Sequence, residues 1–169
     1  MQSLRLKILP LALGIVAAAA MLHSCAGDGC TSGTSSVPVV GFYSSSTQKA
    51  IAVDSLTVYG IGAPGDSLLV NCGRNLSKLE LPLRTSVGNV QFVLHYDQKA
   101  ISDERYNDTI TLAYDAMPWF ESDECGVFYV FDITSHHCTN HLIDSIAVPN
   151  PHVNNLGVET VKLYFRTQE

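Results

Sequence analysis

Apolar residues recur at every second position along most of the chain after residue 36. The alternation is clearest in "VQFVLHYD" (90–97), "TITLAYD" (109–115) and "ETVKLYFR" (159–166). A period of two puts one set of side chains on one face of a strand, so it indicates half-buried β-strands. The residues expected to face the core are Leu56, Val58, Leu79, Leu81, Leu83, Val90, Phe92, Leu94, Tyr96, Ile110, Leu112, Tyr114, Val127, Tyr129, Phe131, Ile133, Val161, Leu163 and Phe165.

Turn residues separate these strands, in "GAPGD", "CGRN", "RYND" and "VPNPHVNN". No stretch after residue 24 shows a sustained helical period of 3.6. Short strands without helical crossovers favour an antiparallel β-sandwich of the immunoglobulin or fibronectin kind over a parallel α/β sheet. A small barrel is the alternative. We expect one such domain over residues 37–169.

The N-terminus has the features of an export signal. Arg5 and Lys7 precede an apolar run over residues 8–22, which is short for a helix that spans a bilayer. The following "LHSC" resembles the lipobox of bacterial lipoproteins, which predicts a signal over residues 1–24 and lipidation of Cys25. A plain secretory signal is the alternative. Two or more acyl chains anchor a protein stably, and the polar residues 25–36 would form a flexible tether.

The charge of the chain is negative. The formal charge is −6, and removal of Arg5 and Lys7 with the signal makes it two units more negative. Nucleic-acid binding requires clustered Lys and Arg, so this composition argues against it.

The cysteine content predicts disulfides. Besides Cys25 the chain has four cysteines, namely Cys30, Cys72, Cys125 and Cys138. An even number outside the cytoplasm is typical of disulfide pairing. The stretch 126–134 reads as one strand, which would hold Cys125 and Cys138 on the order of 30 Å apart. We therefore expect Cys30 and Cys72 to pair with Cys125 and Cys138, in either combination.

The spacing G-x-G-x-x-G occurs at Gly60, Gly62 and Gly65. A dinucleotide loop of this kind needs a helix after it, but here "DSLLVNC" follows, which reads as a strand. Pro64 also removes an amide donor. The spacing therefore predicts a turn between two strands, and no cofactor is expected.

Histidine and cysteine cluster in "HHCTNH", where His136, His137 and His141 are candidate metal ligands. A polar loop or strand edge whose histidines face solvent, without metal, is the preferred interpretation, because Cys138 is assigned to a disulfide. The sequence contains no G-x-S-x-G elbow and no H-E-x-x-H motif. We therefore expect a binding module and not an enzyme.

Asp, then Ser or Thr, then an aliphatic residue occurs four times. The pattern is similar to the O-glycosylation signal of exported Bacteroidetes proteins, and it alternatively reflects strand starts after turns. The hydroxyls concerned are Ser55, Ser67, Thr109 and Ser145.

The lipobox with a nearby second cysteine, "DSLTVYGIGAPGDSLLVNCGRN", "NDTITLAYD" and "CTNHLIDSIAVPNP" resemble an uncharacterised family of small Bacteroidetes envelope lipoproteins. The resemblance implies a lipid anchor in the outer membrane. Only Asp28 supplies acidity directly after Cys25, which favours the periplasmic face. The expected function is an accessory module that binds an envelope protein. The alternatives are a ligand or metal binder that uses residues 136–141, and a hydrolase.

Overall fold

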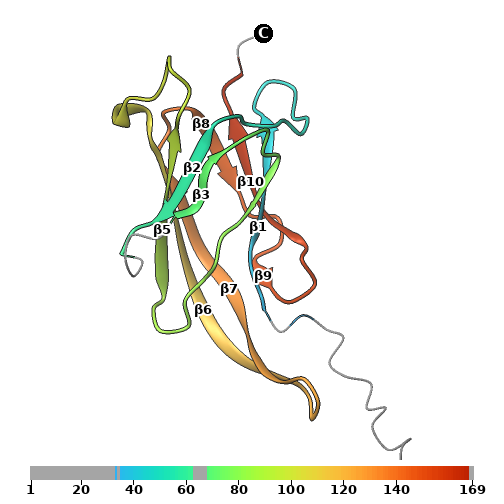
Figure 1. Ribbon diagram of the computed structural model, residues 1–169. Coiled ribbons are helices and arrows are strands. Elements are labelled where there is room, and N and C mark those ends of the chain that lie inside the picture. The colour runs from blue at the N-terminus through green and yellow to red at the C-terminus, as the bar shows by residue number, and fades with distance from the viewer. Residues whose placement is uncertain (1–32, 34, 63–67, 168–169) are drawn as a thin grey trace, which may run out of the picture. The chain divides into compact units, whose positions relative to one another are not determined.

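The computed structural model describes residues 33, 35–62 and 68–167. Its strands form two sheets, one of four strands in the order β4-β1-β10-β8 and one of six in the order β3-β2-β5-β6-β7-β9 (Figure 1). The predicted all-β sandwich is confirmed. The strands are β1 Val39–Ser44, β2 Leu56–Gly60, β3 Leu68–Gly73, β4 Lys78–Glu80, β5 Asn89–Tyr96, β6 Asp108–Ser122, β7 Gly126–Cys138, β8 Ile143–Ala147, β9 His152–Val153 and β10 Glu159–Phe165.

The described part of the chain contains a single helical turn, the 3-10 helix Glu104–Tyr106. No described helix is long and apolar enough to cross a bilayer.

One strand pair departs from the expected antiparallel arrangement. β1 and β10, the first and last strands of the domain, run parallel to each other. The other ladders between strands are antiparallel. Alternation of side chains is the same in parallel and antiparallel strands, so the sequence pattern cannot reveal the direction of a neighbour.

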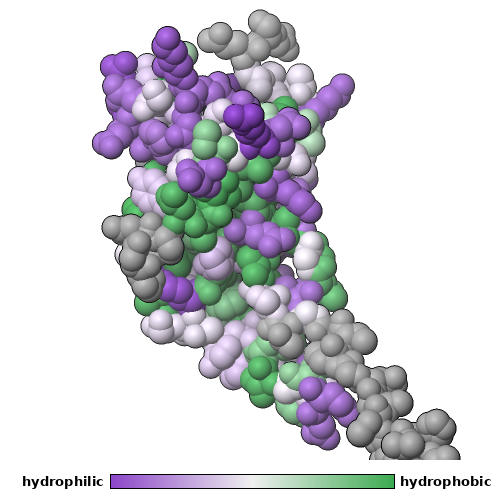
Figure 2. Space-filling view, in the orientation of Figure 1, coloured by the Kyte–Doolittle hydropathy of each residue, from purple (hydrophilic) through white to green (hydrophobic). Residues whose placement is uncertain are grey.

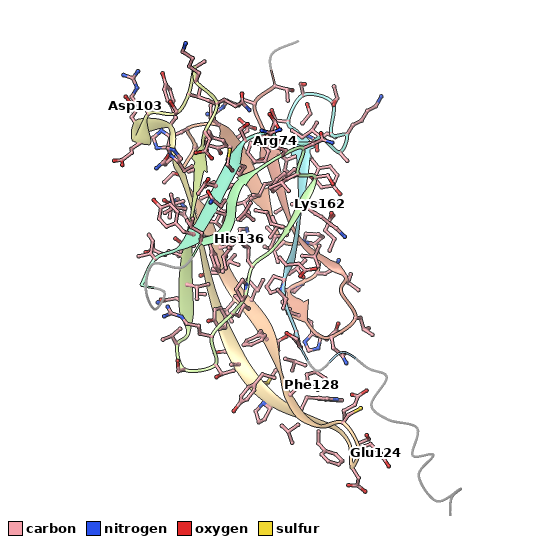
Figure 3. All side chains as sticks on the ribbon, viewed as in Figure 1. Arg74, Asp103, Glu124, Phe128, His136 and Lys162 are labelled. Carbon is pink, nitrogen blue, oxygen red and sulfur yellow. The ribbon has the colours of Figure 1, made fainter. Side chains whose placement is uncertain are left out.

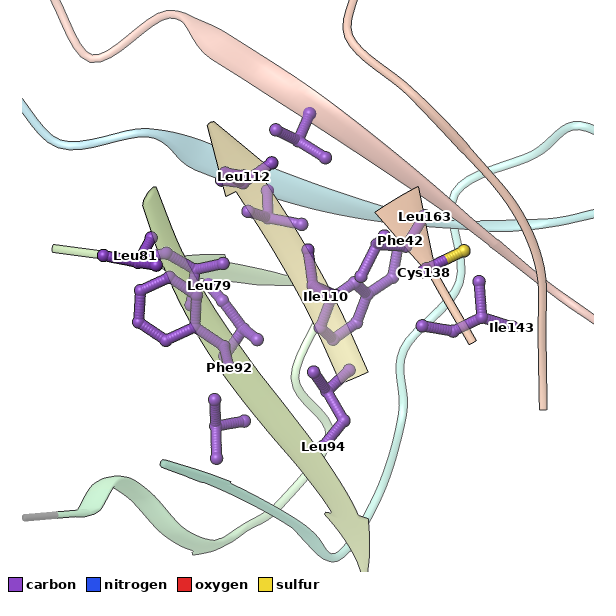
Figure 4. Close-up of a cluster of buried hydrophobic side chains, with 14 of the residues drawn as sticks. Phe42, Leu79, Leu81, Phe92, Leu94, Ile110, Leu112, Cys138, Ile143 and Leu163 are labelled. Carbon is purple, nitrogen blue, oxygen red and sulfur yellow. The ribbon is translucent and has the colours of Figure 1, made fainter. Parts of the chain in front are cut away.

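The core lies between the two sheets and consists of the inward side chains of both (Figure 4). Phe42 and Phe165 of the four-stranded sheet meet edge to face, with ring centroids 5.3 Å apart. Tyr114 and Phe131 of the six-stranded sheet make a similar contact at 5.5 Å. Most residues expected to face the core are buried there, which confirms the register that the alternation predicts.

A buried carboxylate fastens the loop between β7 and β8 to the body of the domain. Asp108 has no exposed surface, and its two oxygens accept five hydrogen bonds. The donors are the Tyr96 hydroxyl (2.9 Å), the Thr139 hydroxyl (3.0 Å) and the backbone N–H groups of His141 (2.8 Å), Leu142 (2.9 Å) and Ile143 (2.9 Å). Burial and the adjacent Asp108 carboxylate raise the pKa of Tyr96 above that of an ordinary phenol, so Tyr96 stays a hydrogen-bond donor.

Two residues of β7 contradict the predicted burial. Val127 and Tyr129 are 61% and 42% exposed, whereas their neighbours Phe128 and Val130 are 5% and 4% exposed. The distal parts of β6 and β7 extend beyond the ends of their neighbouring strands. The side of the hairpin that continues the core face therefore meets no opposing strand among the described residues.

Two identical substitutions distinguish the core from this extension. We expect Val58→Ala, at a position with no exposed surface, to lower the free energy of unfolding by about 2 kcal/mol. Val127→Ala should change it by less than about 0.5 kcal/mol, because the side chain is largely in water already. Urea unfolding of the two variants measures both values, and equal losses would contradict the assignment of Val127 to the surface.

Candidate functional site

The long β6–β7 hairpin projects from the sandwich. β5 pairs with β6 only as far as Ala113, and β9 pairs with β7 only at Phe131 and Asp132. Beyond these points β6 and β7 pair only with each other among the described residues (Figure 1). We call residues 115–130 the distal hairpin. Both of its outer backbone edges are without a neighbouring strand in the described part of the chain.

The distal hairpin is apolar on both faces. Pro118 pairs with Tyr129, and Phe120 pairs with Val127, on the same side of the ladder as Ala116 and the buried Phe131. This exposed face therefore continues the core face past the opposing sheet. The exposed large apolar side chains of the distal hairpin are Met117 (41%), Trp119 (54%), Phe120 (60%), Val127 (61%) and Tyr129 (42%).

The tip of the hairpin is acidic. Glu121, Asp123 and Glu124 are all exposed there, and Figure 3 shows Glu124 at the extreme end, with Phe128 further back along the hairpin. No Lys or Arg occurs between residues 106 and 161, a stretch with eight Asp and Glu. In Figure 2 the hydrophobic surface of the lower part of the molecule ends in a hydrophilic tip. The hairpin therefore combines apolar flanks with a negative end.

A shallow pocket of about 260 Å³ lies between the distal hairpin and the segment after β9. Its apolar lining consists of Trp119, Phe128, Val130 and Leu156, and its polar lining of Glu121, His152, Asn154 and Asn155. Apolar walls with a few polar groups suit the binding of one side chain or a small group.

Hydrogen bonds hold the polar wall of the pocket in place. His152 Nδ1 lies 2.6 Å from Asp132 Oδ1. Asn155 Nδ2 donates to the Gly33 carbonyl at 2.8 Å, and Asn154 Oδ1 accepts from the Leu156 N–H at 3.0 Å. The wall is therefore formed before any ligand arrives.

The predicted disulfides require a correction. Cys72 and Cys138 are free thiols, so neither takes part in a bridge. Cys72 is exposed on β3, while Cys138 faces the interior at the end of β7. Four strand intervals of about 4.8 Å separate β3 from β7 in the sheet order, well beyond the Cα separation of about 7 Å that a disulfide allows.

Cys25 and Cys30 lie outside the described residues. Lipidation of Cys25 and a bridge between Cys30 and Cys125 therefore stay predictions. Cys125 is placed in the turn of the distal hairpin, at the opposite end of β7 from Cys138. The expectation that Cys125 and Cys138 do not pair agrees with this placement.

The two free thiols should differ in reactivity. Burial, together with the carboxylates of Asp108 and Asp144, raises the pKa of the Cys138 thiol, and a raised pKa lowers the thiolate fraction that reacts. We expect a maleimide to modify Cys72 of the native protein at once, and Cys138 only after unfolding. Peptide mass spectrometry with and without denaturant measures this. A bridge at either position in the native protein would contradict the structure.

The described part of the glycine-rich segment fits the predicted turn. Gly60 ends β2, Gly62 has a φ of 68°, and β3 begins at Leu68 and runs antiparallel to β2. Gly65 lies outside the described residues. Leu68, the first described residue after the glycines, begins a strand and not a helix.

The histidine-rich segment begins on strand β7 and continues into the following loop. His136 and His137 are exposed near the end of β7, and consecutive strand residues point to opposite faces. His141 is in the following loop, where its N–H donates to Asp108. Across the described ranges, no group of three His, Cys, Asp or Glu side chains is arranged to hold a metal ion.

The four candidate glycosylation sites differ in accessibility. Ser145 is exposed on β8, while Ser55 is half-buried and donates to Asp54 Oδ2 at 3.0 Å. Thr109 is half-buried on β6, next to Asp108. The hydrogen bonds that Asp108 accepts account for the aspartate of this motif without a glycan. Ser67 lies outside the described residues. Modification of any of them stays a prediction.

Comparison with known proteins assigns the chain to a family. Residues 55–165 match the model of a family described as a family of unknown function (DUF6452). The chain belongs to this family. The match begins one residue before β2 and ends with β10, so the family region includes Asp108 and the whole distal hairpin. Neither the curated proteins nor the solved structures gave a match.

The distal hairpin was not predicted from the sequence. The signal for it is a pair of strands around an acid-rich turn in which odd and even positions alike are apolar. The two stretches are "MPWF" (117–120) and "VFYV" (127–130). A strand buried on one face alternates, so a pair that is apolar on both faces and ends in carboxylates is a sign of a second contact surface.

Proposed function

We propose that this protein is an accessory module of the bacterial cell envelope that binds a protein partner through its distal hairpin. The observation that carries the proposal is the exposure of Trp119 on one face of the projecting hairpin and of Phe120, Val127 and Tyr129 on the other, each at least 42% exposed. Exposed apolar patches of this kind are typical of protein interaction sites, and aromatic residues are enriched at such sites.

The anchor forms part of the same proposal. The lipobox-like "LHSC" supports lipidation of Cys25, and the motifs that resemble Bacteroidetes envelope lipoproteins support an outer-membrane location. The weak acidity after Cys25 favours the periplasmic face. Tethering confines the domain to the membrane surface, which raises its effective concentration near a membrane-bound partner.

A bridge between Cys30 and Cys125 would serve this arrangement. Cys30 follows Cys25 by five residues, and Cys125 lies in the turn of the distal hairpin. The bridge would link the hairpin covalently to the anchored end of the chain.

Affinity capture from cross-linked envelopes tests the proposal. The tagged protein and a Cys25→Ala variant are purified in parallel and analysed by mass spectrometry. We expect a stoichiometric envelope protein with the first and its loss with the second, because the variant lacks the anchor. Recovery of the same set of proteins with both would contradict an anchored module.

A further inference from the structure

The pocket beside the distal hairpin contains one fixed charge, and it is negative. Glu121 supplies this charge from the hairpin. In the described part of the chain its carboxylate makes neither a hydrogen bond nor an ion pair. On the opposite wall, Nδ1 of His152 lies 2.6 Å from Oδ1 of Asp132. A ligand that enters the pocket therefore meets one negative charge that no described residue compensates.

The indole of Trp119 complements this charge. Its side chain is 54% exposed, and it lines the pocket together with the buried Phe128. The face of an indole attracts a cation, and a guanidinium group also stacks on it. An aromatic face beside a carboxylate is an arrangement that accepts the charged end and the apolar stem of a basic side chain.

The hydrogen-bonding groups of the opposite wall fit the same ligand. The Nδ2 of Asn155 donates a hydrogen bond to the Gly33 carbonyl, and the Oδ1 of Asn155 stays available as an acceptor. Arginine and lysine side chains carry only donors, so they match acceptors such as Glu121 and Asn155. The nearby carboxylates Asp123 and Glu124 would steer a cation towards the hairpin.

We propose that the partner inserts an arginine or lysine side chain into the pocket between Trp119 and Glu121. This rests on the proposed function and specifies the chemistry of the partner. A second copy is disfavoured, because a two-fold contact would bring the same carboxylates together. A lipid surface is disfavoured as well, because an acidic tip is repelled by anionic headgroups.

Fluorescence of Trp119, the only tryptophan in the chain, reports directly on this pocket. The probe is a short peptide of alternating valine and arginine, compared with the same peptide in which uncharged citrulline replaces arginine. Each is titrated into the purified protein at physiological salt. The variants are Glu121→Gln, which removes the pocket carboxylate, and Glu124→Gln, which removes the same charge at the tip outside the pocket.

We expect the arginine peptide to shift the emission with saturation, and the citrulline peptide to bind about tenfold more weakly. Glu121→Gln should weaken binding of the arginine peptide by about tenfold, and Glu124→Gln by less than about twofold. Equal losses of affinity in the two variants would overturn the proposal, because they would indicate a general electrostatic attraction and not a contact in the pocket.

Three further results would also overturn the proposed cation-binding pocket. They are equal binding of the citrulline peptide, an emission shift with phosphatidylcholine vesicles alone, and a shift that depends on protein concentration without peptide. Equal binding of the citrulline peptide would leave docking through the apolar face intact. The absence of any response would refute this inference alone, since the photo-crosslinking described in the Discussion tests docking independently.

Discussion

Replacing Asp108 by Ala should lower the free energy of unfolding by about 3–5 kcal/mol. The carboxylate accepts five hydrogen bonds in a site without solvent exposure, so its removal leaves five donors without their acceptor. Three of them are consecutive backbone N–H groups in the segment that leads into β8. We therefore expect this segment to detach before the rest of the domain.

Tyr96→Phe should lower the free energy of unfolding less than Asp108→Ala does. It removes one of the five donors and leaves the Asp108 carboxylate bound by the other four, so about 1–2 kcal/mol should be lost. Urea unfolding gives both values, and hydrogen exchange at Leu142 and Ile143 reports on the loop. A loss below about 1 kcal/mol for Asp108→Ala would show that the carboxylate does not fasten this loop.

The double substitution Phe120→Ser and Tyr129→Ser should weaken binding of the captured envelope partner by at least about 100-fold. Both side chains lie on the exposed face of the distal hairpin, where aromatic residues contribute most to binding energy. Because they are 60% and 42% exposed, the free energy of unfolding should change by less than about 1 kcal/mol. Calorimetry with the purified partner measures the first value, and urea unfolding the second.

Leu68→Ser together with Leu69→Ser provides the matched control. These leucines are 49% and 37% exposed on β3, at the edge of the same sheet and away from the distal hairpin. We expect the control to bind the partner with unchanged affinity. An equal loss of affinity in both double variants would show that the effect is general and does not come from the hairpin.

Much of the fold could be predicted because a sandwich has a simple pattern. Ile110, Leu112 and Tyr114 alternate on β6, and the structure buries all three. The prediction fails at Val127 and Tyr129, where the alternation continues but the opposing sheet does not. A periodic pattern shows which residues share a face, but the length of the neighbouring strands decides whether that face is covered.

The site was harder to predict, because it depends on contacts distant in sequence. The pocket brings Trp119 and Glu121 of β6 next to residues that follow β9, about 30 positions later in the chain. The role of Asp108 was hidden as well, because its donors come from β5 and from the loop after β7. The disulfide prediction failed at Cys72 and Cys138, because an even number of cysteines says nothing about the strands that separate them.

Site-specific photo-crosslinking in living cells tests the central claim most directly. A photoreactive phenylalanine analogue is placed at Phe120, at Tyr129, or at the exposed Lys99, which follows β5 at the end of the sheet away from the distal hairpin. Docking through the hairpin predicts one discrete adduct with an envelope protein from positions 120 and 129, and none from position 99. Adducts of equal yield from all three positions, or none from the two hairpin positions, would contradict it.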